Sequence, residues 1–321
     1  MKSVVTKPVA GKTGSSKTLL LTHPDCLHHE MPHHPERPAR LTAVMDALLK
    51  DDLTGDMHEI LATEISTQLL QGIHPDSYIQ HIESFAGINA VTKVDPDTYM
   101  SPGSLRAAKL AAGAVAEATT RVLSGEANRA FCAIRPPGHH AEVAAALGFC
   151  LFNNIAIAAQ LALQQPGINR VAICDFDVHH CNGTVDIFKD RPEVLVCSSF
   201  QDHFYPHRYL DFSNEHIINT PLEAGTNSGT FRRLIEKNWL PAIQKHKPDL
   251  IFISAGFDAH NDDPLAEICL EDDDYRWVTN FLVDMANSHS KGRIVSTMEG
   301  GYELDALARS ARIHVEQLLL N

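Results

Sequence analysis

The sequence predicts an α/β fold, a single three-layer domain built around a central, mostly parallel β-sheet. Short apolar runs bounded by turn residues recur along the chain, and segments with helical periodicity fill the gaps between them. Strands that alternate with helices in this way favour a parallel sheet with helices on both faces. The 321 residues contain no internal repeat, low-complexity block or evident linker, so we expect one domain.

Seven predicted strands are short and rich in β-branched residues, which is typical of buried strands in parallel sheets. They cover Thr18–Thr22, Ala130–Ile134, Val171–Asp175, Val194–Ser198, Ile217–Thr220, Leu250–Ser254 and Ile294–Thr297. The first predicted helix starts just after Pro38, where apolar residues from Leu41 to Leu49 recur with helical spacing. The other predicted helices cover Ser101–Val122, Phe152–Leu163, Phe231–His246 with a kink favoured at Pro241, Tyr275–Asn287 and Ala306–Leu320.

The composition argues against several classes of protein. A formal net charge of −13 disfavours direct binding to nucleic acid or anionic lipid, and it favours cationic partners such as lysine-rich peptides or polyamines. The longest apolar runs are far shorter than a membrane span. Glycine loops of the dinucleotide or P-loop kind follow none of the predicted strands, which disfavours a nucleotide-dependent enzyme.

Residues 1–17 are basic and contain glycine and serine, but they lack the apolar stretch and the cleavage site of a signal peptide. We expect a disordered leader there and a folded domain over residues 18–321. The seven cysteines, an odd number, have no paired spacing, and several lie inside apolar runs, where cysteine acts as a small hydrophobe. These features fit a reducing compartment, so we expect a cytoplasmic protein.

Polar side chains follow four of the predicted strands, at the point where each strand ends. The four segments are Arg135–His140, Asp175–His180, Ala255–His260 and Met298–Tyr302. In an open parallel sheet the carboxyl ends of the strands lie at one edge, and ligands bind there. The sequence therefore predicts that these four segments converge on one site.

Three of these side chains form a candidate metal site. Asp175, Asp177 and His179 alternate after a buried strand, so they can point the same way, and buried carboxylates require a metal or a cationic partner. Asp177, His179 and Asp258 make a three-ligand set that leaves one position open for water. Such a site lowers the pKa of bound water to about 7. Carboxylate-rich sites accept both zinc and iron.

The remaining polar residues fit metal-assisted hydrolysis of an acyl bond, with water as the nucleophile. Neighbouring residues rarely aim at one ion, so one of His139 and His140 is better suited to act as the general base and later acid. Asp175 and Asn182 are candidates to fix the tautomers of these histidines. Tyr302 can donate a hydrogen bond to a developing oxyanion.

At this point the sequence resembles the zinc-dependent histone deacetylase family of the arginase/deacetylase superfamily, in particular its class II-like and bacterial branches. The matching stretches occur in the family's order: His34–Leu41, Arg135–His140, Gly148–Asn154, Asp175–His180, Ser254–Asp258 and Glu299–Tyr302. The resemblance implies a deacetylase domain over residues 18–321 with the arginase/deacetylase fold and about eight strands. It also implies removal of acetyl groups from lysine side chains.

The resemblance assigns roles by position. Asp177, His179 and Asp258 would bind zinc, His140 would be the general base and acid, and His139, paired with Asp175, its electrostatic partner. Asn182 would partner His140, and Tyr302 would polarise the acyl carbonyl. The substrate channel would involve Gly148, Phe149, Tyr205 and Leu265, with Arg40 near an acetate-exit cavity. A structural potassium ion would be held by Asp175, Asp177, His179, Ser198 and Ser199.

Two features depart from the family pattern or fall outside it. Cys181 stands where family members usually have glycine, and we interpret it as a tolerated small side chain rather than a redox-sensitive thiol or competing ligand. His23, His28, His29, His33 and His34 form a cluster that we interpret as a solvated loop at the channel rim rather than a second metal site.

Three alternatives remain open at this stage. Acetylpolyamine deacetylases use the same machinery, but they carry an acidic residue where this chain has Leu265, which favours an acetylated lysine peptide or protein over a small acetylated amine. A dimanganese ureohydrolase of the arginase type binds a second metal ion and would need more carboxylates after Ser254, where this chain offers only Asp258 next to the strand. A catalytically silent acyl-lysine-binding protein would not need His139, His140 and Tyr302.

Overall fold

The central sheet of the domain is parallel throughout. The computed structural model describes residues 18–50 and 53–320, and the predicted leader over residues 1–17 lies outside them. Eight strands run in the order β2-β1-β5-β10-β9-β6-β7-β8, all paired in parallel. They are β1 Thr18–Thr22, β2 Met57–Leu61, β5 Arg129–Cys132, β6 Val171–Asp175, β7 Val194–Gln201, β8 Ile217–Leu222, β9 Leu250–Ala255 and β10 Ile294–Met298. The short strands β3 (Thr92–Lys93) and β4 (Tyr99–Met100) form a separate antiparallel pair.

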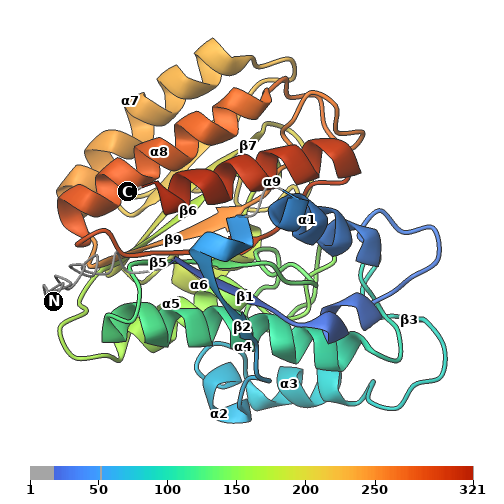
Figure 1. Cartoon of the computed structure of the whole chain (residues 1–321). Coiled ribbons are helices and arrows are strands. Elements are labelled where there is room, and N and C mark those ends of the chain that lie inside the picture. Colours follow the sequence, from blue (N-terminus) through green and yellow to red (C-terminus); the bar gives the residue numbers. More distant parts are fainter. Residues whose placement is uncertain (1–17, 51–52, 321) are drawn as a thin grey trace, which may run out of the picture.

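Helices cover both faces of the sheet, as predicted (Figure 1). Helices α1, α7, α8 and α9 lie on one face, and α4 and α5, with α2 and α3 beyond them, lie on the other. Their bounds are α1 Pro38–Lys50, α2 Thr67–Leu70, α3 Asp76–Glu83, α4 Ser104–Ser124, α5 Asn154–Leu163, α6 Asn182–Phe188, α7 Ser228–His246, α8 Asp272–His289 and α9 Leu304–Leu319. The single three-layer α/β domain expected from the sequence is confirmed.

All seven predicted strands are present, and the structure adds β2 at the edge of the sheet. Because β2 pairs only with β1 and exposes much of its length, its sequence lacks the apolar run that marks a buried strand. The central strands β6 and β9 are buried along their whole length. This burial explains why their apolar runs were readable in the sequence.

Capping residues place several helix ends away from the limits of the apolar pattern. Helix α8 begins at Asp272 rather than at the predicted Tyr275, because Glu271 and Asp274 form a capping box. Helix α7 begins at Ser228, where the Asn227 side chain accepts the Thr230 N–H, and it continues without a break through Pro241. Asp272, Asp273 and Asp274 form the first turn of α8, where negative charge is favoured by the helix dipole.

The buried histidine His314 makes the stability of the fold sensitive to acid. Its two ring nitrogens lie 2.7 Å from the Thr279 hydroxyl and 2.8 Å from the Ser296 hydroxyl. Burial lowers the pKa of His314 from 6.5 to about 3 in the folded protein. The unfolded chain therefore binds the extra proton first, so this contribution to stability is complete above pH 6.5 and declines as the pH falls below it.

We expect the free energy of unfolding of the wild type to fall relative to that of a His314→Gln variant as the pH is lowered from 7 to about 4. The slope of this difference approaches ~1.4 kcal/mol per pH unit, the value for one proton. Urea unfolding of both proteins across this range measures it, and the comparison cancels the titration of all other groups. A difference that does not change with pH would contradict the assignment.

Candidate active site

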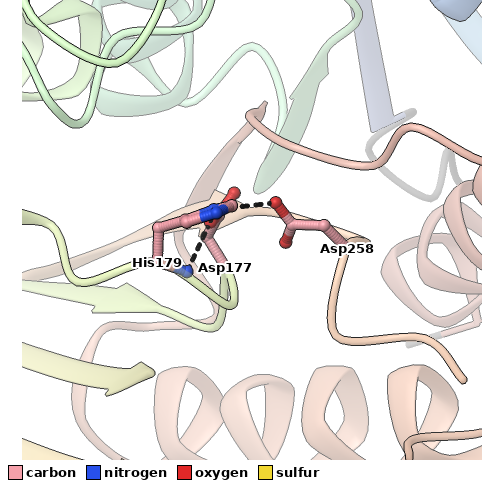
Figure 2. A group of neighbouring side chains, drawn as sticks. All are labelled: Asp177, His179 and Asp258. Carbon is pink, nitrogen blue, oxygen red and sulfur yellow. Dashed lines mark hydrogen bonds and ion pairs between the residues drawn. The ribbon is translucent and has the colours of Figure 1, made fainter. Parts of the chain in front are cut away.

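Asp177, His179 and Asp258 converge at the carboxyl edge of the sheet (Figure 2). Asp177 and His179 follow β6, and Asp258 follows the neighbouring strand β9. His179 Nδ1 lies 3.0 Å from Asp177 Oδ1 and 3.1 Å from Asp258 Oδ2. Among the described residues, this is the one group of three or more acidic, histidine or cysteine side chains with metal-ligand spacing, its atoms all within 4.8 Å of one another.

Backbone N–H groups hold the two carboxylates in place. Asp258 Oδ1 accepts the Val178 N–H at 2.9 Å, and Asp177 Oδ2 accepts the Gly300 N–H at 2.8 Å. A side chain at Gly300 would place its Cβ only 2.0 Å from Asp258 Oδ2. Glycine is therefore required at position 300 for the loop after β10 to close over this site.

The charges and burial of this group fit a divalent cation. Burial would lower the pKa of His179, but the two carboxylates outweigh it and raise the pKa to about 10. Burial raises the pKa of Asp258, and its Oδ2 accepts no well-aligned hydrogen bond although water cannot reach it. Two buried carboxylates beside one imidazole thus need positive charge, and oxygen and nitrogen donors of this kind suit zinc or iron.

His139 and His140 lie beside the metal-ligand group, and each has a different partner. His139 Nδ1 lies 3.0 Å from Asp175 Oδ2, and His140 Nδ1 lies 2.6 Å from Asn182 Oδ1. The ring centroids of the two histidines are 4.0 Å apart. Asp175 and Asn182 therefore take the positions expected of them, beside the histidines.

The protein's own charges separate the two histidines. Burial would lower the pKa of His139, but Asp177 and Asp175 outweigh it and raise the pKa to about 10. Burial, together with the neighbouring His139, holds the pKa of His140 well below its usual range. A cationic His139 beside a neutral His140 is the arrangement in which His140 can accept a proton.

A narrow pocket of about 80 Å³ leads to these groups. It is lined by Asp97, His140, Gly148, Phe149, His179, Tyr205, Leu265 and Tyr302. All four residues predicted for the substrate channel are among them. Burial raises the pKa of Tyr302 well above its usual range, so its phenol stays protonated and able to donate a hydrogen bond.

The walls of the pocket depend on an unusual backbone at Gly148 and Phe149. Both residues have positive φ, 55° at Gly148 and 68° at Phe149. A Cβ at position 148 would lie 2.2 Å from the His140 ring, so only glycine fits there. The Phe149 ring packs edge-on against His34 at 4.6 Å and faces Tyr302 at 6.1 Å, which places His34 at the rim as expected.

One part of the histidine cluster was predicted wrongly. His29 is fully buried, not solvated: its Nδ1 lies 2.6 Å from the Ser104 hydroxyl and its Nε2 lies 3.4 Å from Glu36. Glu36 also accepts two hydrogen bonds from Arg135 and one from Arg40. His29 therefore belongs to a buried ionic network beneath the site, and its neighbours in sequence do not reveal that.

Arg40 links this network to the loop after β10. Its guanidinium donates to the carbonyls of Glu299 and Gly301, both at 2.5 Å, and lies 4.9 Å from the centre of the Tyr302 ring. Arg40 thus fixes the backbone on both sides of Gly300 and supports the tyrosine.

The residues expected to hold a monovalent cation lie together on β6, β7 and the loop after β6. Asp175 pairs with Ser198 across the two strands, and the Ser198 hydroxyl is buried without a hydrogen-bond partner. Cys181 is buried near Ser198 and Asp175, with a φ of −77°. Since that φ is open to every residue type, a side chain in place of glycine causes no backbone strain here.

Three acidic residues of the site were missed in the sequence. Asp263 accepts the N–H groups of Leu265, Tyr302 and Glu303, so it ties a channel wall to the tyrosine loop. Glu299 accepts the N–H groups of Gly138 and His139, and Asp97 lines the pocket and accepts the Gly148 N–H. Each also binds backbone at least 39 residues away in the chain, and no local pattern marks those contacts.

Comparison with known proteins decides the family. The histone deacetylase domain family matches residues 34–318. The chain belongs to the histone deacetylase family. It is 36% identical over 275 residues to a histone deacetylase-like amidohydrolase of Pseudomonas aeruginosa, covering 84% of this chain and 71% of the relative. It is 34% identical over 299 residues to a probable deacetylase of Archaeoglobus fulgidus, covering 90% and 82% respectively.

A solved structure supports the same conclusion. The crystal structure of the HDA15 HD domain superposes with a TM-score of 0.90 at 34% sequence identity, covering 95% of this chain and 89% of the other. The chain is thus a histone deacetylase-family amidohydrolase, a hydrolase with an α/β fold. In the described part of the chain no helix is long and apolar enough to span a membrane.

Proposed function

We propose that this protein is a zinc-dependent deacetylase that removes acetyl groups from the side-chain amines of lysine residues in peptides or proteins. The observation that supports this most strongly is the pocket itself. His140, His179 and Tyr302 line one narrow space, so a base, a metal ligand and a hydrogen-bond donor reach the same bound group.

Asp177, His179 and Asp258 would hold the metal, with iron as the alternative to zinc. When bound, zinc supplies Lewis acidity that lowers the pKa of water to about 7 and polarises a carbonyl. Asp175, Asp177, His179, Ser198 and Ser199 would hold a structural potassium ion, which suits their buried oxygen atoms, and two of these residues would contribute backbone carbonyls.

The chain's own groups would divide the chemistry as follows. His140 accepts a proton from the attacking water at Nε2 and later gives it to the departing amine. His139, kept cationic by Asp175 and Asp177, stabilises negative charge beside it. Tyr302 donates a hydrogen bond to the acyl oxygen as negative charge develops there.

The pocket walls would select and hold the substrate. The Gly148 carbonyl would accept the N–H of the scissile amide, while Phe149 and Tyr205 enclose the alkyl stem and exclude water. Arg40, held beneath Tyr302, would line the route by which acetate leaves.

Leu265 favours a lysine side chain over an acetylated polyamine. It is an apolar group in the pocket lining, where reading a remote amine would require a carboxylate. An acetylpolyamine or other small acetylated amide is the second candidate substrate, because the catalytic groups would act on either amide equally.

The test compares an acetyl-lysine peptide with N-acetylputrescine at matched concentrations, together with quantification of metal in the purified protein. We expect a higher kcat/KM for the peptide and one catalytic metal ion per chain. In a Leu265→Glu variant the ratio should shift towards N-acetylputrescine. A clear preference of the wild type for the polyamine would overturn the lysine assignment, and binding of acetyl-lysine peptide without turnover would favour a silent binding protein.

A further inference from the structure

A chain of hydrogen bonds runs outward from His140 through two further side chains. His140 Nδ1 lies 2.6 Å from Asn182 Oδ1, and Asn182 Nδ2 donates to Glu142 Oε1 at 2.8 Å. On the far side, Arg208 Nη1 donates to Glu142 Oε2 at 2.5 Å. Glu142 is 8% exposed and lines no part of the pocket, whereas the Arg208 side chain is 53% exposed.

The donors and acceptors along this series of hydrogen bonds permit only one arrangement of the Asn182 amide and the His140 ring. An ionised carboxylate can only accept hydrogen bonds, so Glu142 requires Asn182 to present its NH₂ group. The amide oxygen of Asn182 then faces His140, and the His140 ring must carry its proton on Nδ1 to meet it. The unprotonated nitrogen is therefore Nε2, the one that can take a proton from water.

An amide alone does not make this choice. Asparagine has a donor and an acceptor of the same shape, so a rotated Asn182 would present NH₂ to His140 and favour the opposite tautomer. Within the described residues, the one other acceptor for the Asn182 NH₂ group is the His140 carbonyl, at a longer 3.3 Å. The buried carboxylate is the closer and the charged acceptor, and charge-assisted hydrogen bonds are the stronger ones.

We propose that Glu142 is a positioning residue that orients the Asn182 amide and thereby keeps His140 in the tautomer that can act as a base. This inference rests on the proposed role of His140. Arg208 neutralises the outer oxygen of Glu142, and the other oxygen is left to accept from Asn182.

An exchange of acid and amide tests the proposal. In Glu142→Gln, Arg208 attracts the new carbonyl oxygen and the NH₂ group faces Asn182, so we expect kcat to fall about 10- to 100-fold, the usual cost of losing an outer partner of a catalytic group. In Asn182→Asp, two carboxylates face each other and kcat should fall as well. In the double variant, the new carboxylate at position 182 accepts from His140 and from the new amide at position 142, so kcat should recover to within about tenfold of wild type.

Three controls separate this role from a structural one. Arg208→Ala removes only an exposed partner, so kcat should change less than about threefold. KM should stay constant in Glu142→Gln because the residue does not contact the pocket. Metal content is measured in every variant, so that a loss of metal is not mistaken for loss of the base.

The tautomer can also be observed without turnover. In zinc-loaded protein labelled with ¹⁵N-histidine, the His140 signals should indicate a proton on Nδ1 in the wild type and a shift towards Nε2 protonation in Glu142→Gln. Unchanged signals, or a double variant no better than the worse single one, would overturn the proposal. Failure of the proposed function would appear differently, as a wild type without deacetylase activity, and the NMR comparison would still decide the role of Glu142.

Discussion

Replacing Tyr302 with phenylalanine is expected to lower kcat by about 100- to 1000-fold, the usual cost of losing one oxyanion donor. The phenol of Tyr302 lines the pocket and stays protonated at all working pH values, since burial raises its pKa well above the usual range. The ring itself is retained, so its contacts with Phe149 and Arg40 should survive.

The affinity of the variant for substrate distinguishes this loss of turnover from unfolding of the protein. The Tyr302→Phe variant should bind an acetyl-lysine peptide with nearly wild-type affinity, because the hydrogen bond matters most when negative charge develops on the oxygen. Steady-state kinetics, peptide binding and thermal unfolding measured on both proteins provide the comparison. If the variant retained full turnover, Tyr302 would not be the group that stabilises the oxyanion.

Replacing Asp258 with asparagine is expected to remove most of the bound metal and most of the activity. Asp258 supplies one of the two carboxylates of the group, and a neutral amide offers a weaker oxygen donor to a divalent cation. Removing an outer partner of a metal ligand can lower metal affinity by roughly 100-fold, and removing a direct ligand should lower it at least as much. Elemental analysis of the purified variant and activity measured against added zinc check this expectation.

A nearby aspartate provides the matched control for this substitution. Asp262 lies in the same loop, but its side chain is half exposed and pairs with Arg309. Asp262→Asn should keep metal content and activity close to wild type. Chelation of the wild type should abolish activity, and re-addition of zinc or iron should restore it, with the more effective ion indicating the native one. Full activity of metal-free protein would contradict the metal site altogether.

Much of the active site was predictable because its residues follow buried strands directly. The apolar runs of β6 and β9 are readable since they are buried on both faces, and Asp177, His179 and Asp258 come two to four residues after them. Because the strands are parallel, the segments that follow them begin at the same edge of the sheet, whatever conformation the loops adopt. The other buried strands could be predicted for the same reason, and the partly buried edge strand β8 was also predicted, whereas the more exposed edge strand β2 was not.

Other residues were out of reach because their partners lie far away in the chain. Asp263 binds the backbone of Tyr302 and Glu303, and Glu299 binds the backbone of Gly138 and His139, more than 30 residues away in each case. His29 looked like part of a solvated loop, yet it lies buried against Ser104 and Glu36. Neither the composition of the chain nor the periodicity of its apolar residues indicates such contacts.

The sequence by itself determined which chemical groups this protein can bring to one place: acidic and imidazole side chains, a phenol and glycines, each directly after a strand. Strand burial is reflected in short apolar runs, and the alternation of strands with helices indicates parallel pairing, so both can be predicted from the sequence. Only the tertiary structure decided how those groups are tuned. Hydrogen-bond orientation, as in the Glu142–Asn182–His140 chain, and the pKa difference between His139 and His140 depend on distances and burial between distant segments, and those exist only once the chain has folded.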